Sequence, residues 1–182
     1  KYKDWEKVIV SSDKDFYQLI SDKTKLYRPI QDDLVDYPSL IENFKIHPKN
    51  FALARSLVGD KSDNLPGVPR VGLKTVAGKF PFLKESQQYE VEDIMQHCET
   101  LEKRLKLHEN ILEHSRLVEK NYKIMQLYSP SISYLHQRQI NFSLQEFEPK
   151  LEKLELTKKL HYDGINAGSF NVLFNSVKKI TL

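Results

Sequence analysis

Cysteine is almost missing from this 182-residue chain, and so are long apolar runs and an excess of charge of either sign. The one cysteine, Cys98, cannot form an internal disulfide, which favours a reducing, cytoplasmic setting, and its apolar neighbours predict inert core packing. No run approaches the roughly 18 apolar residues of a membrane span, and no basic-then-apolar leader is present, so we expect neither a membrane nor a secreted protein. The net charge of +3 comes from 28 basic and 25 acidic residues. Because these charges are well mixed, any nucleic-acid partner must be contacted by a local basic cluster.

The chain has enough apolar residues for a core, with 40% hydrophobic content, nine Phe and nine Tyr. Residues 1–45 have α/β character: strands are predicted at 7–11, 25–30 and 34–37, with a short helix at 16–20. The strand at 7–11 comes almost at the start of the chain, and a strand by itself is not stable. We therefore expect the sheet to which it belongs to lie in sequence that is absent here. Residues 1–45 are therefore predicted to be the C-terminal part of an α/β core.

Residues 46–182 are predicted to be mostly helical. Asn50 is expected to cap a helix over 51–58, a loop follows over 60–70, and a second helix covers 72–80. Residues 88–120 carry an apolar stripe that shifts after Leu105, which indicates either a break or a two-sided helix. Ser143 and Glu146 form a possible capping box for a later helix, and residues 170–177 predict the last one. We expect Lys178-Lys179-Ile180 to be a frayed end rather than a partner-binding tail.

Two pairs of aspartates are spaced so that their side chains can converge. Asp13 and Asp15 follow the first strand, and if that strand continued to Asp15 both carboxylates would share one face. The ends of strands in α/β sheets are also where ligand sites usually lie. Asp60 and Asp63 follow Gly59, and a three-residue step in a helical turn brings both to one side.

Four carboxylates at one point repel each other unless a cation neutralises them. Hard oxygen ligands suit Mg²⁺ or Mn²⁺, and two such ions about 4 Å apart can activate water and stabilise a leaving oxygen in phosphodiester cleavage. An Asp-x-Asp pair alone is more often a solvated loop or a helix cap. We interpret Asp32-Asp33, for example, as an ordinary turn.

The stretch Leu65-Pro66-Gly67-Val68-Pro69-Arg70-Val71-Gly72-Leu73-Lys74-Thr75 places two glycines in a tight connection between helices. Glycine there lets backbone N–H groups approach a phosphate, and the start of the second helix adds its positive dipole end. Arg70, Lys74 and Lys79 supply local positive charge. These features predict a grip on a nucleic-acid backbone that does not depend on base sequence.

The segments Ser12-Asp13-Lys14-Asp15-Phe16, Gly59-Asp60-Lys61-Ser62-Asp63-Asn64 and Leu65 to Thr75 together resemble the flap endonuclease superfamily. The chain looks most like phage-type 5′–3′ exonucleases and the 5′ nuclease domain of bacterial DNA polymerase I, over residues 8–83. The resemblance implies an α/β nuclease core remnant (PIN/FEN-like) followed by a mostly α-helical helix-three-turn-helix domain over 46–182. A helix–hairpin–helix is expected at about 51–80.

The resemblance also implies roles for individual residues. Asp13, Asp15, Asp60 and Asp63 would bind the second of two active-site metals, Mg²⁺ or Mn²⁺. The hairpin would grip duplex DNA, with K⁺ held by hairpin carbonyls; this DNA-binding role falls to Gly67, Val68, Arg70, Val71, Gly72 and Lys74. The family's first-metal carboxylates and its helical arch come from sequence N-terminal to the Ser-x-Asp-x-Asp segment. We therefore expect that this chain by itself binds DNA, and that cleavage needs the missing N-terminal nuclease half.

The expected function is two-metal hydrolysis by a 5′–3′ exonuclease or flap endonuclease in replication or repair, including RNase H-like primer removal. The expected substrate is a 5′ flap, a nick or an RNA-primed duplex. We expect a monomer in the cytoplasm of a bacterial or phage-infected cell. Two alternatives stay open, a non-catalytic DNA-binding module and a PIN-type ribonuclease. Four retained aspartates favour the enzyme, since a pure binder has no use for negative charge beside a phosphate backbone.

Overall fold

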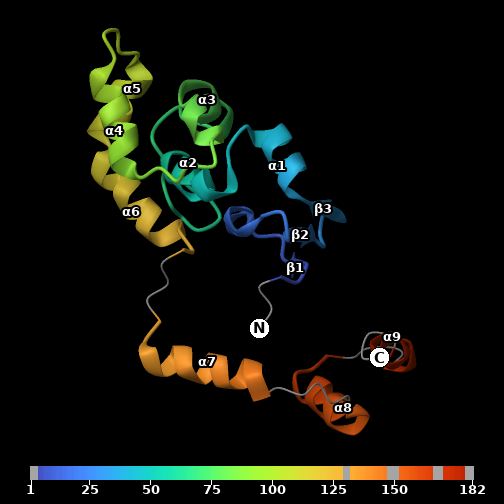
Figure 1. Cartoon of the computed structure of the whole chain (residues 1–182). Coiled ribbons are helices and arrows are strands. Elements are labelled where there is room, and N and C mark those ends of the chain that lie inside the picture. The colour runs from blue at the N-terminus through green and yellow to red at the C-terminus, as the bar shows by residue number, and fades with distance from the viewer. Residues whose placement is uncertain (1–3, 129–131, 147–151, 166–169, 179–182) are drawn as a thin grey trace. The chain divides into compact units, whose positions relative to one another are not determined.

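The computed structural model describes residues 4–128, 132–146, 152–165 and 170–178 (Figure 1). Contacts divide the chain into a larger unit, Tyr2–Pro130, and a smaller unit formed by Ser131–Leu182 together with Lys1. This division does not test the boundary predicted near residue 45, which stays a prediction. Within the described residues, no helix is both long and apolar enough to cross a membrane.

Three short strands form one sheet in the larger unit. β1 (Lys7–Val10) pairs in parallel with β2 (Thr24–Arg28), and β2 pairs antiparallel with β3 (Asp33–Val35). Leu26 at the centre is fully buried and is in register with Ile9 and Val35. The second and third strands were predicted at 25–30 and 34–37, which lie one to two residues further towards the C-terminus than β2 and β3. β2 ends at a turn in which Asp32 has a φ of 52°, and β3 ends because Asp36 begins a helix.

The first strand ends at Val10, so the condition under which Asp13 and Asp15 would share one face of a strand is not met. Asp13 instead caps a 3₁₀ helix, η1 (Lys14–Leu19), by accepting a hydrogen bond from the Asp15 backbone N–H at 2.8 Å. The short polar side chain competes with the sheet for the backbone, which ends the strand early. The two carboxylates therefore come together through a cap and a helical turn.

Helices make up the rest of the larger unit: α1 (Tyr37–Phe44), η2 (Pro48–Asn50), α2 (Phe51–Val58), α3 (Leu73–Lys79), η3 (Pro81–Lys84), α4 (Val91–Thr100), α5 (Lys106–Glu113) and α6 (Ser115–Met125). α2 is central, because residues 51–57 are all buried and the helix contacts α3, α6, η1 and η2. The apolar stripe predicted over 88–120 is interrupted, and α4, α5 and α6 pack against one another (Figure 1). Cys98 is buried in α4, and burial raises its thiol pKa to about 11, so the prediction of inert packing is confirmed.

Asn50 precedes α2 as predicted, but its side chain does not cap the helix. Its amide donates instead to the carbonyl oxygens of Leu83, Glu85 and Gln87, and its carbonyl oxygen accepts from the Tyr89 N–H. Asn50 is fully buried, so these bonds satisfy a polar group that would otherwise be costly. The residue ties the η3 segment to the start of α2.

The smaller unit contains α7 (Tyr134–Glu146), α8 (Lys153–Tyr162) and α9 (Phe170–Lys178). Ser143 and Glu146 lie inside α7, so the predicted capping box was wrong. Asp163 and Gly164 form a turn after α8, with Gly164 at a φ of 70°, and α9 matches the last predicted helix. Phe174 is buried, and Lys153 lies over its ring. Lys179 and Ile180 of the predicted frayed end lie outside the described residues.

Candidate active site

A pocket of about 590 Å³ brings together the two segments that carry the aspartate pairs. Asp13 lines the pocket at the start of η1, and Asp60 and Asp63 line it from the turn that follows α2. Two lysines, Lys14 and Lys61, line the same pocket. Side chains far apart in the sequence thus share one cavity of mixed charge.

The turn after α2 is shaped by backbone pairing. Asp60 and Leu65 exchange both of their N–H···O=C hydrogen bonds at 2.8 Å, which closes the intervening residues into a loop. Within this loop, the Asp60 carboxylate accepts from the Ser62 N–H at 2.8 Å and from the Ser62 hydroxyl at 2.5 Å. Asp63 stays exposed on the same loop. The loop therefore fixes one oxygen of Asp60 and leaves Asp63 free to meet a ligand.

Arg55 in α2 contacts one carboxylate of each pair. Its Nε lies 3.2 Å from Oδ1 of Asp15, and its NH2 nitrogen donates to Oδ2 of Asp60. The Nε contact is an ion pair without the geometry of a hydrogen bond. Arg55 is only 5% exposed, and a buried guanidinium requires such partners. Sequence analysis did not single out this residue, although an arginine among the apolar residues of Phe51–Val58 is a signal for a buried ion pair.

Asp15, which does not itself line the pocket, is the aspartate whose pKa responds to the charges of the other three. Burial raises the pKa of Asp15; Arg55 opposes this, while the charges of Asp13, Asp60 and Asp63 reinforce it. The pKa of Asp60 is lowered, mainly because the Ser62 hydroxyl donates to its carboxylate. The four aspartates are therefore near enough for three of them to raise the pKa of Asp15, while their shared role as metal ligands stays a prediction.

The chemistry of the four side chains fits a hard divalent cation, since ionised carboxylates offer only oxygen acceptors. In the part of the chain that the structure describes, however, no three acidic, histidine or cysteine side chains are arranged to hold one metal ion. Asp15 and Asp60 are turned towards Arg55 instead. The donor types fit the metal, while two of the four carboxylates are engaged by a protein cation.

The loop between α2 and α3 contains glycines with different structural roles. A Cβ at Gly67 would collide with the Val58 carbonyl, and one at Gly59 would collide with the backbone of residues 65–67. A Cβ at Gly72 would meet nothing within 4 Å. Close packing of the loop on α2 therefore explains why residue 67 is a glycine. At Gly72, just before α3, the space around the position is open.

Val68 and Val71 are buried, and their backbone N–H groups are used inside the loop. Val68 donates to the Leu57 carbonyl at 2.8 Å, and Val71 donates to the Val68 carbonyl at 3.2 Å. Arg70 and Lys74 are exposed and form no ion pair with another described residue. Of the predicted DNA-binding residues, these two cations are the side chains available to an outside partner.

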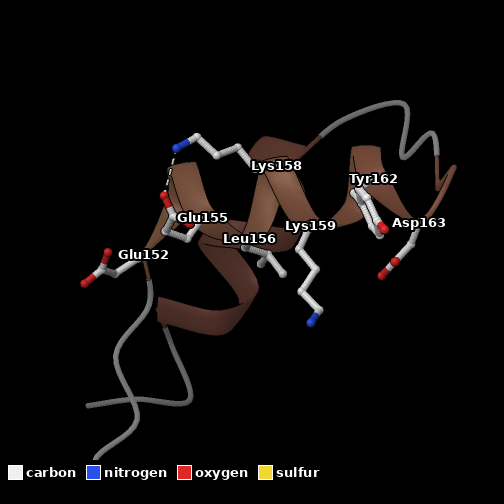
Figure 2. A pocket seen from close by; sticks show the side chains of 7 residues that line it. All are labelled: Glu152, Glu155, Leu156, Lys158, Lys159, Tyr162 and Asp163. Atoms are coloured by element: carbon white, nitrogen blue, oxygen red, sulfur yellow. Dashed lines mark hydrogen bonds and ion pairs between the residues drawn. The ribbon is translucent and has the colours of Figure 1, made fainter.

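A second cavity, of about 690 Å³, lies along α8 in the smaller unit. Figure 2 shows its seven lining side chains, with Lys158 paired to Glu155 at 2.9 Å. Six of the seven are exposed, and only Leu156 is half-buried. It lacks a convergence of carboxylates from two distant segments such as the first pocket has, so the first pocket remains the candidate active site.

The chain is similar to two 5′-3′ exonucleases and to a bacterial DNA polymerase I. It is 41% identical over 68 residues to a 5′-3′ exonuclease of Buchnera aphidicola subsp. Schizaphis graminum, covering 37% of this chain and 24% of that protein. It is 42% identical over 71 residues to DNA polymerase I of Thermus aquaticus, covering 39% and 8%. A longer similarity, 29% over 155 residues, relates it to a 5′-3′ exonuclease of Aquifex aeolicus, covering 84% of this chain and 50% of that protein.

The fold is similar to that of bacteriophage T5 5′-exonuclease, with a TM-score of 0.53 at 20% identity. That similarity covers 65% of this chain and 46% of the phage protein. A T5 flap endonuclease complex with DNA and metal ions matches equally, at a TM-score of 0.53, covering 42% of that chain. No protein-family model matches the sequence. The chain thus spans at most about half the length of these relatives.

Proposed function

Since this chain is homologous to the 5′–3′ exonucleases and to the 5′ nuclease part of bacterial DNA polymerase I, we propose that it forms part of a metal-dependent 5′ nuclease. The observation that carries this proposal is the single pocket shared by Asp13, Asp60 and Asp63. The reaction would be phosphodiester hydrolysis at a 5′ flap, a nick or an RNA-primed end, in replication or repair.

The proposed metal ligands are Asp13, Asp15, Asp60 and Asp63. Bound Mg²⁺ or Mn²⁺ ions would supply an activated water and stabilise the leaving oxygen. The protein's own contribution is to hold the carboxylates on two rigid supports, the capped start of η1 and the closed loop after α2. Lys14 and Lys61 at the same pocket would attract the phosphate backbone towards these carboxylates.

The DNA grip is proposed to be the α2–loop–α3 segment, acting as a helix–hairpin–helix. Arg70 and Lys74 would contact backbone phosphates, and the open space at Gly72 would allow a close approach. Gly67, Val68 and Val71 would support this surface from inside the loop, since their backbones pack and bond there. The resemblance adds a K⁺ ion held by hairpin carbonyls to the proposal.

We propose that the remaining metal ligands come from outside these 182 residues, because the chain spans about a quarter to a half of the exonuclease relatives. The buried, unpaired Cys98 fits the cytoplasmic location proposed for a monomeric protein of this kind.

The first experiment measures binding and cleavage of a fluorescent 5′-flap duplex by this chain, in Mg²⁺ and in EDTA. We expect binding that Mg²⁺ strengthens, because the metal offsets carboxylate–phosphate repulsion, and no cleavage by the chain alone. Asp60→Asn with Asp63→Asn should bind more tightly in EDTA and lose most of the Mg²⁺ effect. Asp32→Asn removes a charge from a turn outside the pocket and serves as the matched control.

The outcomes separate the competing functions. If the duplex affinity is the same in Mg²⁺ and in EDTA, for both the unchanged chain and the double variant, a non-catalytic DNA-binding module would be favoured. Preference for single-stranded RNA over the flap duplex would favour a PIN-type ribonuclease. Metal-dependent cleavage by the chain alone would contradict the proposal that further ligands lie elsewhere.

The proposed grip has its own test in the salt dependence of binding. Lys74→Ala should weaken binding and reduce the slope of log K against log salt by about 0.9, the value for one phosphate contact. Lys103→Ala, an exposed lysine between α4 and α5, is the matched control and should leave the slope unchanged. An unchanged slope in Lys74→Ala would remove Lys74 from the phosphate contacts.

A further inference from the structure

Arg55 divides the four aspartates into two kinds. Asp15 and Asp60 are ion-paired to it, and their side chains are only 20% and 17% exposed. Asp13 and Asp63 are exposed and form no ion pair within the described ranges. The guanidinium thus joins the η1 segment to the loop after α2 through one carboxylate of each.

Arg55 cannot easily leave this position. Its side chain is 7% exposed, and the residues on both sides of it, Ala54 and Ser56, are fully buried in α2. A buried guanidinium separated from its carboxylates would carry an uncompensated charge. Conversely, Asp15 and Asp60 without a cation would face each other and the two remaining carboxylates.

A divalent cation and Arg55 need the same oxygen lone pairs. A guanidinium binds carboxylate oxygens through charge-assisted hydrogen bonds. The oxygens of Asp15 and Asp60 that contact Arg55 would have to turn away from it before they could bind a metal ion. With Arg55 in place, no three carboxylates of the described residues converge on one point.

We infer that Arg55 is the resident counter-ion of the carboxylate pocket, and that a divalent cation must displace it from Asp15 and Asp60. Arg55 is then a positioning residue that acts through Asp15 and Asp60, and its competition for their oxygens lowers the metal affinity. Asp13 and Asp63 would be open to a divalent cation, whereas Asp15 and Asp60 would be available to it only where Arg55 no longer engages them. This inference rests on the proposed metal-dependent function and goes beyond it by assigning a competitor inside the protein.

The test is calorimetric titration of Mg²⁺ alone into the 182-residue chain, without DNA. Arg55→Met removes the competing charge while keeping an apolar stem, and should bind Mg²⁺ about tenfold more tightly than the unchanged chain. Arg55→Lys keeps the charge but cannot reach both carboxylates with a fork, so its affinity should lie between the two. If Arg55→Met does not fold, the Mg²⁺ affinity of Arg55→Lys, compared with that of the unchanged chain, still tests the inference.

Arg28→Met is the matched control. Arg28 also pairs with an aspartate, Asp33, at 3.5 Å, but neither residue lines the carboxylate pocket. This variant should bind Mg²⁺ as the unchanged chain does. A shift in Arg28→Met as large as in Arg55→Met would make the effect one of net charge alone and overturn the inference.

Other outcomes are equally decisive. Equal Mg²⁺ affinity in all the variants would leave Arg55 as a structural ion pair and overturn the inference, while the proposed metal site would stand. Weaker binding in Arg55→Met would show that Arg55 organises the ligands rather than competing with the metal. Failure of every protein, including the unchanged chain, to bind Mg²⁺ would refute the proposed metal site itself, and the inference with it.

Discussion

The side-chain amide of Asn121 donates a hydrogen bond to the carbonyl oxygen of Pro66 at 2.8 Å, so α6 holds the loop that carries Asp60 and Asp63. The same amide donates to the Ser56 carbonyl at 3.1 Å, and Asn121 is 1% exposed. One side chain therefore links α6, α2 and the hairpin, although it lies more than fifty residues from either partner in the sequence.

Asn121→Ala should destabilise the chain by about 1–3 kcal/mol, because the buried Ser56 carbonyl and the part-buried bond to the Pro66 carbonyl lose their donor. Urea unfolding measures the change. Asn110→Ala is the control, since the Asn110 amide makes only a 3.5 Å contact with the Pro69 carbonyl in an exposed setting. Equal losses in both variants would show that the Asn121 bonds carry no special weight.

Gly67→Ala and Gly78→Ala should change stability in opposite directions. A Cβ at Gly67 collides with the Val58 carbonyl, which should cost about 2 kcal/mol or more. A Cβ at Gly78, inside α3, meets nothing within 4 Å, and alanine there should add about 0.5–1 kcal/mol of helix stability. Thermal melts of the two variants check both signs, and a stabilised Gly67→Ala would contradict the described packing of the loop.

Arg70→Gly should make the chain more stable and its DNA binding weaker. Arg70 has a φ of 64°, a left-handed conformation that costs a side-chain-bearing residue about 1–2 kcal/mol. Part of that gain is lost to the greater freedom of glycine in the unfolded chain, so we expect a net gain of about 0.5 kcal/mol.

Lys45→Gly is the matched control for Arg70→Gly. Lys45 is an exposed cation with a φ of 56° at the end of α1, so glycine there should stabilise the fold similarly without weakening DNA binding. Thermal melts and fluorescence anisotropy measure the two effects. Equal DNA affinity for both variants would remove Arg70 from the proposed grip.

Asp36→Ala should lower stability by about 1 kcal/mol at pH 7, because the Asp36 carboxylate caps α1 by accepting a hydrogen bond from the Ser39 N–H at 3.0 Å. The Ser39 hydroxyl, followed by the Ser39 N–H, holds the pKa of Asp36 below its usual value. A lowered folded-state pKa gives stability that is complete above the unfolded value of about 3.9 and is lost as pH falls through the folded value.

The loss in Asp36→Ala should therefore shrink only below about pH 4. Urea unfolding between pH 7 and pH 2.5 measures it. Asp22→Ala removes an exposed carboxylate that has no hydrogen bond within the described residues, and should show a small effect with no such trend. A constant loss across the range would show that the cap works without the charge.

Much of the site was predictable because its chemistry is local in sequence. The spacing of Asp60 and Asp63 after Gly59 predicted a turn with both carboxylates on one side, and the two share a pocket wall. The helices on either side of the hairpin, 51–58 and 73–79, match their predicted ranges within a residue.

The parts that sequence reasoning missed depend on distant contacts. Asn50 was expected to cap α2, but carbonyl groups more than thirty residues away take its amide. Arg55 was overlooked because its importance appears only when α2 is packed between η1 and the loop after it. Local spacing could not show either partner, since each comes from another segment.

The contact of Gly59 with Gly67 limits how this segment can change over evolution. The atoms nearest to a Cβ at either position all belong to the main chain. A clash with a side chain can be relieved by a smaller residue elsewhere, but a clash with a carbonyl or an amide nitrogen has no such remedy. Suppressor mutations should therefore be rare for substitutions at these two positions, whereas a replacement at Gly72 should need no second change for the chain to fold.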